Sequence, residues 1–246
     1  MIWLRSLLYT TLLFLSVPVH ATCVLLLSPF GHRVYYPVAV NWARVNLWLL
    51  KKICGLDFVV EGLEHVPAEP CVLYWKHESV FETMAGALVL PPQTWVVKRE
   101  LMWLPFFGWG LALLKPIAIN RAAGRTAVKQ VIRQGQERLK EGLCVVIYPE
   151  GTRVLPGHQR RFGISGAALA KAAGVPVLPV AHNAGDFWSR RSLHKFPGTI
   201  RVVIGPPIPT AELSHEEITT RGREWILATR NRISAPLATR SNGSLN

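Results

Sequence analysis

A helical pattern, one glycine and an apolar run follow one another in the stretch TAVKQVIRQGQERLKEGLCVVIY, residues 126–148. From Thr126 to Glu141, apolar or small residues recur at helical spacing: Val128, Val131, Ile132, Gly135 and Leu139. Gly142 closes this pattern. The run Leu143–Tyr148 has the length and composition of a buried strand. The stretch therefore predicts a helix that leads into a buried strand.

The same alternation continues on both sides of this unit. Five further apolar runs read as strands: Phe58–Val60, Cys71–Trp75, Thr94–Val97, Val175–Val180 and Ile200–Ile204. A second helix, about Gly166 to Ala173, connects two of the strands, and its small residues permit close packing on a sheet. Strands that alternate with helices predict an α/β domain, with a mostly parallel central sheet flanked by helices.

The N-terminus is strongly apolar. Between Ile2 and Leu27 the only charged side chain is Arg5, so this segment is long enough to enter or cross a bilayer. A secretory signal peptide is the alternative, with Leu7 to Val19 as its apolar core and a cleavage site at Val19-His20-Ala21. That alternative is weakened because the apolar character resumes immediately at Val24.

A second candidate membrane helix runs from about Val38 to Ile53. Trp42, Trp48 and the pair Lys51-Lys52 are typical of a helix anchored at the level of the lipid headgroups, although an ordinary surface helix is the alternative. Basic residues follow the first apolar segment, so the positive-inside rule predicts that the rest of the chain is cytoplasmic. We therefore expect membrane-associated helices over 1–55, the α/β domain over 56–233 and a flexible tail over 234–246.

Composition and charge narrow the class of protein. The 246 residues are 50% hydrophobic and only 17% charged, with a formal net charge of +13. A basic chain is attracted to nucleic acid or to an anionic bilayer, and the apolar content favours the bilayer. We expect no nucleic-acid partner, because no zinc-finger, RNA-recognition or basic heptad pattern is present. The four cysteines form no CxxC pair, and Cys71 and Cys144, which lie in strand-like apolar runs, indicate buried thiols in a reducing compartment.

The first cluster with chemical potential follows the predicted strand Cys71–Trp75. His77 lies where α/β sheets place their ligands, and a histidine can accept a proton from a hydroxyl near neutral pH. A carboxylate on the other ring nitrogen would fix the tautomer. Glu82 is suited to this role if His77 lies in a loop and Glu82 in the first turn of a helix; Glu78 competes for it.

Other chemistries fit this cluster less well. A zinc protease would require His-Glu-x-x-His, but the fifth position is Phe81. A serine hydrolase would require Gly-x-Ser-x-Gly, and the stretch Gly163–Ala167 lacks the final glycine. The alternative is that His77 only caps a helix, among solvated acids, and has no catalytic function.

Two further stretches carry cations. Tyr148-Pro149-Glu150-Gly151-Thr152-Arg153 follows a predicted strand; Gly151 permits a tight turn, Thr152 can donate a hydrogen bond and Arg153 can bind a phosphate. A plain turn is the alternative. In residues 98–109, Lys98 and Arg99 precede an aromatic run that could line an acyl-chain channel, enter the membrane interface or belong to the core. Arg121 adds another cation, and residues 121–161 contain nine basic and three acidic side chains.

Together these stretches form four boxes in a specific order. They are His-x4-acid (His77 to Glu82), Lys-x-Glu-Leu with a following Pro-x-x-Gly (from Lys98), Glu-Gly-Thr-Arg (from Glu150) and Val-Pro-Val-Leu-Pro-Val (Val175–Val180). From roughly Phe58 to Pro207, the chain resembles the glycerophospholipid acyltransferase family, specifically the bacterial 1-acylglycerol-3-phosphate acyltransferases.

The resemblance implies roles for individual residues. His77 would deprotonate the acceptor hydroxyl, oriented by Glu82 in place of the family's usual aspartate. Lys98 and Arg153 would hold the phosphate of the acceptor, while Glu150 and Gly151 would shape its pocket. The strand around Pro176 would border the donor site.

The implied reaction transfers an acyl group from acyl-carrier protein or coenzyme A to lysophosphatidate, at the bacterial inner membrane with the active site facing the cytoplasm. We expect no cofactor, no metal and no covalent enzyme intermediate. Two departures, Glu82 for aspartate and Asn120 for the aspartate that often precedes an arginine, affect the acceptor most. Another acceptor such as a lyso-ornithine lipid is the nearest alternative, and a non-catalytic lipid-binding protein is the alternative from another class.

Overall fold

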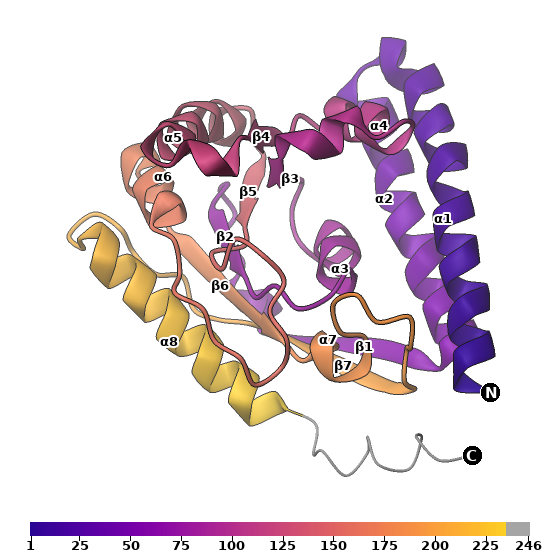
Figure 1. Ribbon diagram of the computed structural model, residues 1–246. Coiled ribbons are helices and arrows are strands. Elements are labelled where there is room, and N and C mark those ends of the chain that lie inside the picture. The colour runs from indigo at the N-terminus through magenta and orange to yellow at the C-terminus, as the bar shows by residue number, and fades with distance from the viewer. Residues whose placement is uncertain (235–246) are drawn as a thin grey trace.

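A seven-stranded sheet forms the centre of the molecule in the computed structural model, which describes residues 1–234 (Figure 1). Its strands are β1 (Leu56–Glu61), β2 (Val72–Trp75), β3 (Gln93–Lys98), β4 (Ile117–Ile119), β5 (Cys144–Ile147), β6 (Val177–His182) and β7 (Gly198–Ile204). Their order is β1-β7-β6-β2-β5-β3-β4, and only the β6–β7 pair is antiparallel. The predicted α/β fold with a mostly parallel sheet is therefore confirmed.

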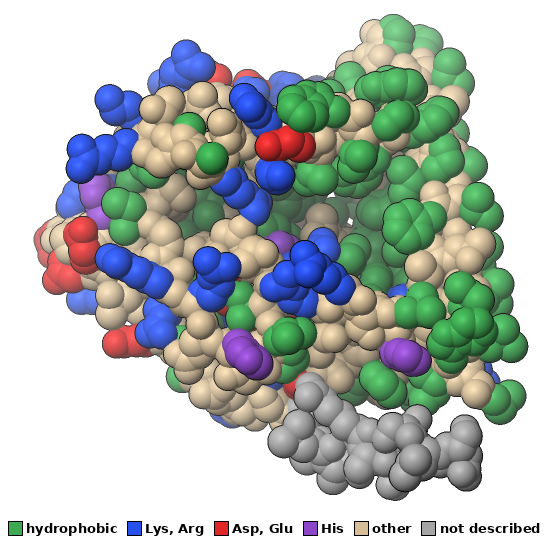
Figure 2. Space-filling view, viewed as in Figure 1, with side chains coloured by type: hydrophobic (Ala, Val, Ile, Leu, Met, Phe, Trp, Pro, Cys, Tyr) green, Lys and Arg blue, Asp and Glu red, His purple; other side chains and the backbone are tan. Residues whose placement is uncertain are grey.

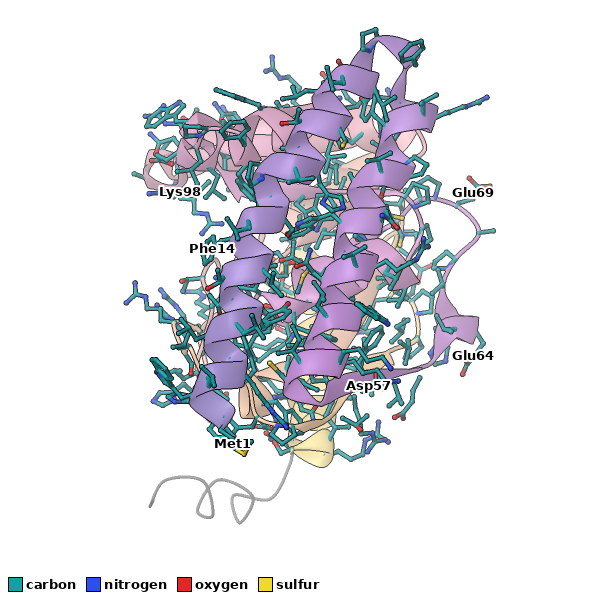
Figure 3. All side chains as sticks on the ribbon, turned by 90° about the vertical axis from the view of Figure 1, so that its right-hand side faces the viewer. Met1, Phe14, Asp57, Glu64, Glu69 and Lys98 are labelled. Carbon is teal, nitrogen blue, oxygen red and sulfur yellow. The ribbon has the colours of Figure 1, made fainter. Side chains whose placement is uncertain are left out.

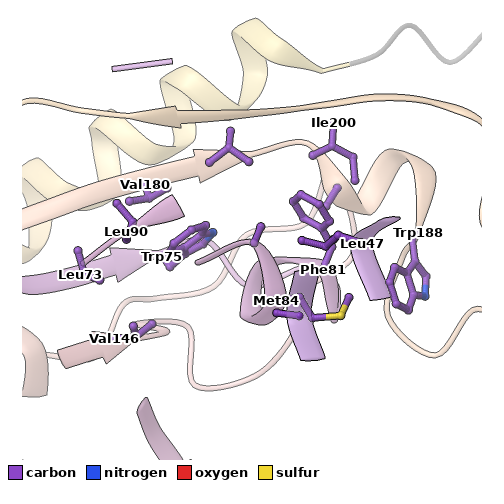
Figure 4. Packing of buried hydrophobic residues seen from close by; sticks show 14 of the residues in the cluster. Leu47, Leu73, Trp75, Phe81, Met84, Leu90, Val146, Val180, Trp188 and Ile200 are labelled. Atoms are coloured by element: carbon purple, nitrogen blue, oxygen red, sulfur yellow. The ribbon is translucent and has the colours of Figure 1, made fainter. Parts of the chain in front are cut away.

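The central strand β2 explains why helices cover both faces of the sheet. All four of its residues are buried, as expected for a parallel strand without a solvent face. Leu73 and Trp75 belong to a core with the N-terminal helices and α3 (Phe81–Val89), and Figure 4 shows this packing. Val72 and Tyr74 belong to a second core on the opposite face, under α5 (Arg125–Lys140), α6 (Ser165–Ala173) and α8 (His215–Ile233).

The helices on these faces have clear bounds. They are α1 (Ile2–Leu27), α2 (His32–Leu49), α3 (Phe81–Val89), α4 (Phe107–Leu113), α5 (Arg125–Lys140), α6 (Ser165–Ala173), α7 (Ala184–Phe187) and α8 (His215–Ile233). Short helical turns cover 28–30, 50–54, 63–65, 99–103 and 121–123. The predicted helices over 126–141 and 166–173 correspond to α5 and α6, and the expected helical turn at Glu82 is the start of α3.

Several elements were absent from the predicted strands and helices, among them β4, α7 and α8. Strand β4 has three residues and adds only an edge to the sheet. Helix α8 has 19 residues and carries a recognisable start signal, because Ser214 and Glu217 form a reciprocal capping box. That signal in the sequence would have predicted α8.

The N-terminal helices α1 and α2 form an antiparallel hairpin against one side of the sheet domain (Figure 3). Residues 2–30 form the only described helix that is long and apolar enough to cross a membrane. One face of α1 is buried, including Tyr9 and Leu13, whereas Leu4, Phe14 and Leu15 on the same helix are exposed. Asn46 and Trp42 of α2 both donate to the Ser16 hydroxyl, which joins the two helices by polar contacts.

Of the four cysteines, Cys23 is exposed and the other three are buried. Cys71 and Cys144 are buried free thiols, as predicted, and Cys54 is buried as well. Of the predicted tail over 234–246, residues 235–246 lie outside the described residues.

Helix α6 approaches β2 closely because Gly166 has no side chain. A Cβ at this position would lie 2.2 Å from Cε1 of the fully buried Tyr74. We predict that Gly166→Ala destabilises the protein by about 1–3 kcal/mol, because the Tyr74 ring has no space into which to move. Thermal unfolding of the purified protein measures this effect.

The control for this prediction is Ala172→Ser, an exposed position on the same helix, which should change the stability by less than about 0.5 kcal/mol. The cost of Gly166→Ala should also be smaller in a Tyr74→Leu background, since the two side chains compete for one volume. Equal costs in both backgrounds would contradict this account of the packing.

Candidate active site

Strands β2 and β5 bring two of the predicted boxes together. They are parallel neighbours with Tyr74 opposite Ile147, so their carboxyl ends meet at one edge of the sheet. His77 follows β2 at this edge, and residues 150–153 follow β5. Ligands of open α/β sheets bind at this edge, which makes it the candidate active site.

A hydrogen bond joins His77 to Glu82 at the start of α3. The distance between His77 Nδ1 and Glu82 Oε1 is 2.8 Å. The carboxylate of Glu82 also accepts hydrogen bonds from the backbone N–H of Glu78 at 3.0 Å and of Ser79 at 2.9 and 3.0 Å. Burial alone would raise the pKa of Glu82, but His77 and these donors lower it below its ordinary value. An ionised carboxylate thus faces the ring of His77.

This contact determines the chemistry available to His77. Burial lowers the pKa of His77 and Glu82 opposes that shift only in part, so the ring is neutral at pH 7. An acceptor on Nδ1 places the ring hydrogen there and leaves Nε2 as the proton-accepting atom. The ring stacks on Tyr148 with 3.9 Å between centroids and lines a cavity. His77 is therefore held as a general base should be.

A second histidine lies behind Glu82 and was not found by sequence reasoning. The fully buried ring of His182, at the end of β6, has its Nε2 2.8 Å from the carbonyl oxygen of Lys76, while its Nδ1 accepts from the N–H of Ala184 at 3.1 Å. Its Nε2 lies 3.8 Å from Glu82 Oε2, close enough to help lower the pKa of that carboxyl.

Glu78 does not compete for His77. Its carboxylate instead accepts hydrogen bonds from Nε of Arg230 at 2.9 and 3.1 Å and from the N–H of Gly185 at 3.2 Å. Of the two acids that the sequence left open, the structure places Glu82 on the imidazole.

The Glu-Gly-Thr-Arg box divides into a buried and a cavity-facing part. Glu150 is buried; it forms an ion pair with Lys76 and accepts from the backbone N–H of His77 at 2.9 Å. Gly151 adopts φ +69°, and its carbonyl accepts from Arg121. Thr152 is half-buried in the same turn. Arg153 lines the cavity beside His77, and its buried Nε has no partner within the described residues.

The cavity itself has a volume of about 280 Å³ and predominantly apolar walls from α1, α2, α3, β3 and α4. Among its lining residues, the only ones that carry a full charge are Arg121 and Arg153. The aromatic run 98–109 contributes Leu101 and Phe107 to the wall, while Trp103 and Trp109 are exposed. Side chains of this run therefore divide between the cavity wall and the exposed surface.

Of the predicted site residues, His77, Arg121 and Arg153 line the cavity; Glu82, Glu150, Gly151 and Thr152 do not, and neither does Lys98. Lys98 ends β3, its side chain is about half exposed, and its Nζ lies 3.6 Å from Glu100 (Figure 3). The structure therefore places His77, Arg121 and Arg153 at one cavity, with Glu82 on the ring of His77 and Glu150 on its backbone N–H. No cluster of three or more His, Cys, Asp or Glu side chains in the described part of the chain is arranged to hold a metal ion.

The surface beside the cavity is strongly basic. Residues 151–211 contain eight basic side chains, of which Lys195 is buried, and a single acid, Asp186, which forms an ion pair with Arg230. A second cavity of about 240 Å³ next to the first is lined by Arg153, Arg160 and Arg190, among others. Figure 2 shows Lys and Arg side chains around a hollow in the surface, whereas the hairpin edge is hydrophobic.

Comparison with known proteins places this arrangement in a family. A family model described as "Acyltransferase" matches residues 57–183, slightly more than half of the chain. A 1-acyl-sn-glycerol-3-phosphate acyltransferase of Pseudomonas aeruginosa is 43% identical over 236 residues, covering 94% of this chain and 92% of that protein. The human 1-acyl-sn-glycerol-3-phosphate acyltransferase beta is 31% identical, covering 86% of this chain and 76% of that protein.

A solved structure shares the fold. The crystal structure of the 1-acyl-sn-glycerophosphate acyltransferase PlsC from Thermotoga maritima matches with a TM-score of 0.80 and 23% identity, covering 96% of this chain and 99% of that one. The match includes the hairpin as well as the sheet domain. On the family match and the two relatives above 30% identity, the chain belongs to the acyltransferase family.

Proposed function

We propose that this protein transfers an acyl group from a thioester to the free hydroxyl of 1-acylglycerol-3-phosphate and so forms phosphatidate. The observation that carries this proposal is the His77–Glu82 pair at an apolar cavity that also presents Arg121 and Arg153. The names of the relatives support the acceptor, since both are 1-acyl-sn-glycerol-3-phosphate acyltransferases.

In the proposed step, Nε2 of His77 takes the proton from the acceptor hydroxyl while its oxygen attacks the thioester carbonyl. Glu82 stabilises the imidazolium that forms. The tetrahedral intermediate then breaks its carbon–sulfur bond, and the departing thiolate takes the proton from His77. The products are an ester and a free thiol, and the enzyme returns to its starting state without a covalent intermediate, a metal or a cofactor.

The cavity suits both ends of the lipid substrates. Arg121 and Arg153 offer guanidinium groups to the acceptor phosphate, and Nε of Arg153 has no hydrogen-bond partner among residues 1–234. The apolar walls from α1 and α2 suit acyl chains, which would enter from a bilayer. We propose that the exposed apolar side chains of α1 rest in the bacterial inner membrane, with the basic face towards the cytoplasm.

The two departures from the family pattern do not favour another acceptor. Glu82 reaches His77 at an ordinary hydrogen-bond distance, so the longer acid is accommodated. Asn120 uses its side chain to accept from the N–H of Ala122 and caps the short turn 121–123, which leaves Arg121 to face the cavity.

The first test is acyl transfer with labelled donor and a panel of lyso-acceptors, including 1-acylglycerol-3-phosphate and a lyso-ornithine lipid. His77→Ala should lower kcat by at least about 100-fold, because general-base catalysis typically contributes that much. Full activity of this variant would refute the mechanism, whereas His77-dependent transfer to a different acceptor would refute only the acceptor.

The pH profile tests the contact between His77 and Glu82. Since His77 works as a neutral base, kcat/KM should fall with decreasing pH through a pKa below the ordinary value of 6.5. Glu82→Gln removes the carboxylate that raises the pKa of His77, so the acid limb should move to lower pH while the rate falls. An acid limb at the wild-type position would show that Glu82 does not act on His77.

The arginines at the cavity are tested through the Michaelis constant. Arg153→Ala should raise KM for 1-acylglycerol-3-phosphate by about 10- to 100-fold, because a charge-assisted hydrogen bond to the phosphate is lost. Arg125→Ala is the matched control, since Arg125 is exposed and outside the cavity lining. An unchanged KM in Arg153→Ala would remove this residue from the acceptor site.

The donor is proposed to be acyl-carrier protein rather than coenzyme A, because an acidic carrier complements the basic surface around the cavity. The double variant Arg160→Glu/Arg161→Glu reverses two exposed charges there. It should lower kcat/KM by at least about tenfold with acyl-carrier protein at low salt, and much less at 0.5 M salt, where charges are screened. Equal loss with acyl-coenzyme A would contradict a carrier-specific surface.

A further inference from the structure

Five charged side chains are buried together behind the loop that carries His77. They are Lys76, Glu78, Glu150, Asp186 and Arg230, and each side chain is at most 6% exposed where its ion pairs are formed. Buried charges are costly unless each has a partner of opposite sign. The five groups are therefore interdependent, and the removal of one changes the position of the others.

These groups form a continuous path from the C-terminal helix to the backbone of His77. Arg230 of α8 donates through Nε to Glu78 at 2.9 Å and through Nη2 to Asp186 at 2.9 Å. Nζ of Lys76 lies 3.7 Å from Glu78 Oε1 and also pairs with Glu150. Glu150 then accepts the backbone N–H of His77 at 2.9 Å.

Arg230 lies at the end of this path, away from the proposed substrates. It does not line the cavity, and neither do Lys76, Glu78 or Glu150. It also lies outside residues 57–183, which the family model matches. A direct role in binding or chemistry is therefore not available to it, but the geometry of His77 depends on the groups that it holds.

We propose that Arg230 and Lys76 are positioning residues, which act through Glu78 and Glu150 to hold the peptide of His77 in the orientation that proton transfer requires. By this route the C-terminal helix α8 takes part in catalysis, and Glu150 serves the base rather than the acceptor. The inference rests on the proposed function of His77.

If Arg230 and Lys76 act by positioning His77, their replacement should change kcat with little change in KM. Displacement of a general base by about 1 Å can cost on the order of 100-fold in rate, whereas Arg121 and Arg153, which face the acceptor, keep their places. A residue that binds the acceptor would show the reverse pattern, as proposed for Arg153.

The test uses the full-length enzyme in phospholipid vesicles, with kcat and KM for 1-acylglycerol-3-phosphate measured on wild type, Arg230→Met and Glu150→Ala. We expect both variants to lose at least about tenfold in kcat, with KM within about twofold of wild type. Arg232→Met is the matched control, since Arg232 is an exposed arginine two residues away on the same helix, and it should behave as wild type. A wild-type kcat in Arg230→Met, or a raised KM in Glu150→Ala with unchanged kcat, overturns the proposal.

A conservative variant separates positioning from a requirement for folding. Arg230→Lys keeps one buried cation, but its single ammonium cannot bond Glu78 and Asp186 with the planar fork of the guanidinium. It should fold, with a thermal midpoint close to that of wild type, and show a kcat between those of wild type and Arg230→Met. If Arg230→Met does not fold and Arg230→Lys has the wild-type kcat, the role of Arg230 is structural and the proposal fails.

The acceptor panel keeps this test independent of the proposed function. If wild type transfers acyl groups to another lyso-lipid in a His77-dependent manner, the same variants are compared on that acceptor and the positioning proposal stands or falls on its own. If His77→Ala retains full activity, the proposed function fails first, and any loss in Arg230→Met then has another cause.

Discussion

The buried carboxylate of Glu82 is the constraint on which the rest of the site depends. An ionised carboxylate can be buried only where donors surround it, and here the backbone N–H groups of Glu78 and Ser79 donate three hydrogen bonds and His77 donates another. Those donors exist because the chain leaves β2 and turns directly into α3, whose N-terminus favours negative charge. The same turn fixes the tautomer of His77.

The sheet brings residues of the site that are distant in the sequence close together. Because β2 and β5 are parallel neighbours, the loops that follow them must meet, and this brings Arg153 to His77 across 76 residues of sequence. The α1–α2 hairpin then adds an apolar wall to the same cavity. An acyltransferase of lipids requires both a polar centre and an apolar space, and in this protein they come from different layers of the fold.

Charge is used in two ways in this molecule. On the surface, the nearly acid-free segment 151–211 creates a positive field beside the cavity, which acts over distances of about a Debye length. In the interior, the pairs around Lys76 and Arg230 hold loops in place and are not screened by salt. Since an incompletely paired buried charge is costly, the interior pairs tolerate less change than the surface arginines do.

The sequence alone determined the α/β fold, because the spacing of apolar residues and the positions of glycines are local properties. The structure retains them in the strands and in α5 and α6. It also located His77, Glu82 and Arg153, which lie at strand ends or in short boxes. It did not decide between Glu82 and Glu78, exclude Lys98 from the cavity lining, or reveal His182 and Arg230. Those facts depend on side-chain direction and on contacts between residues up to 152 positions apart, which only the packing of β6 and α8 against the His77 loop establishes.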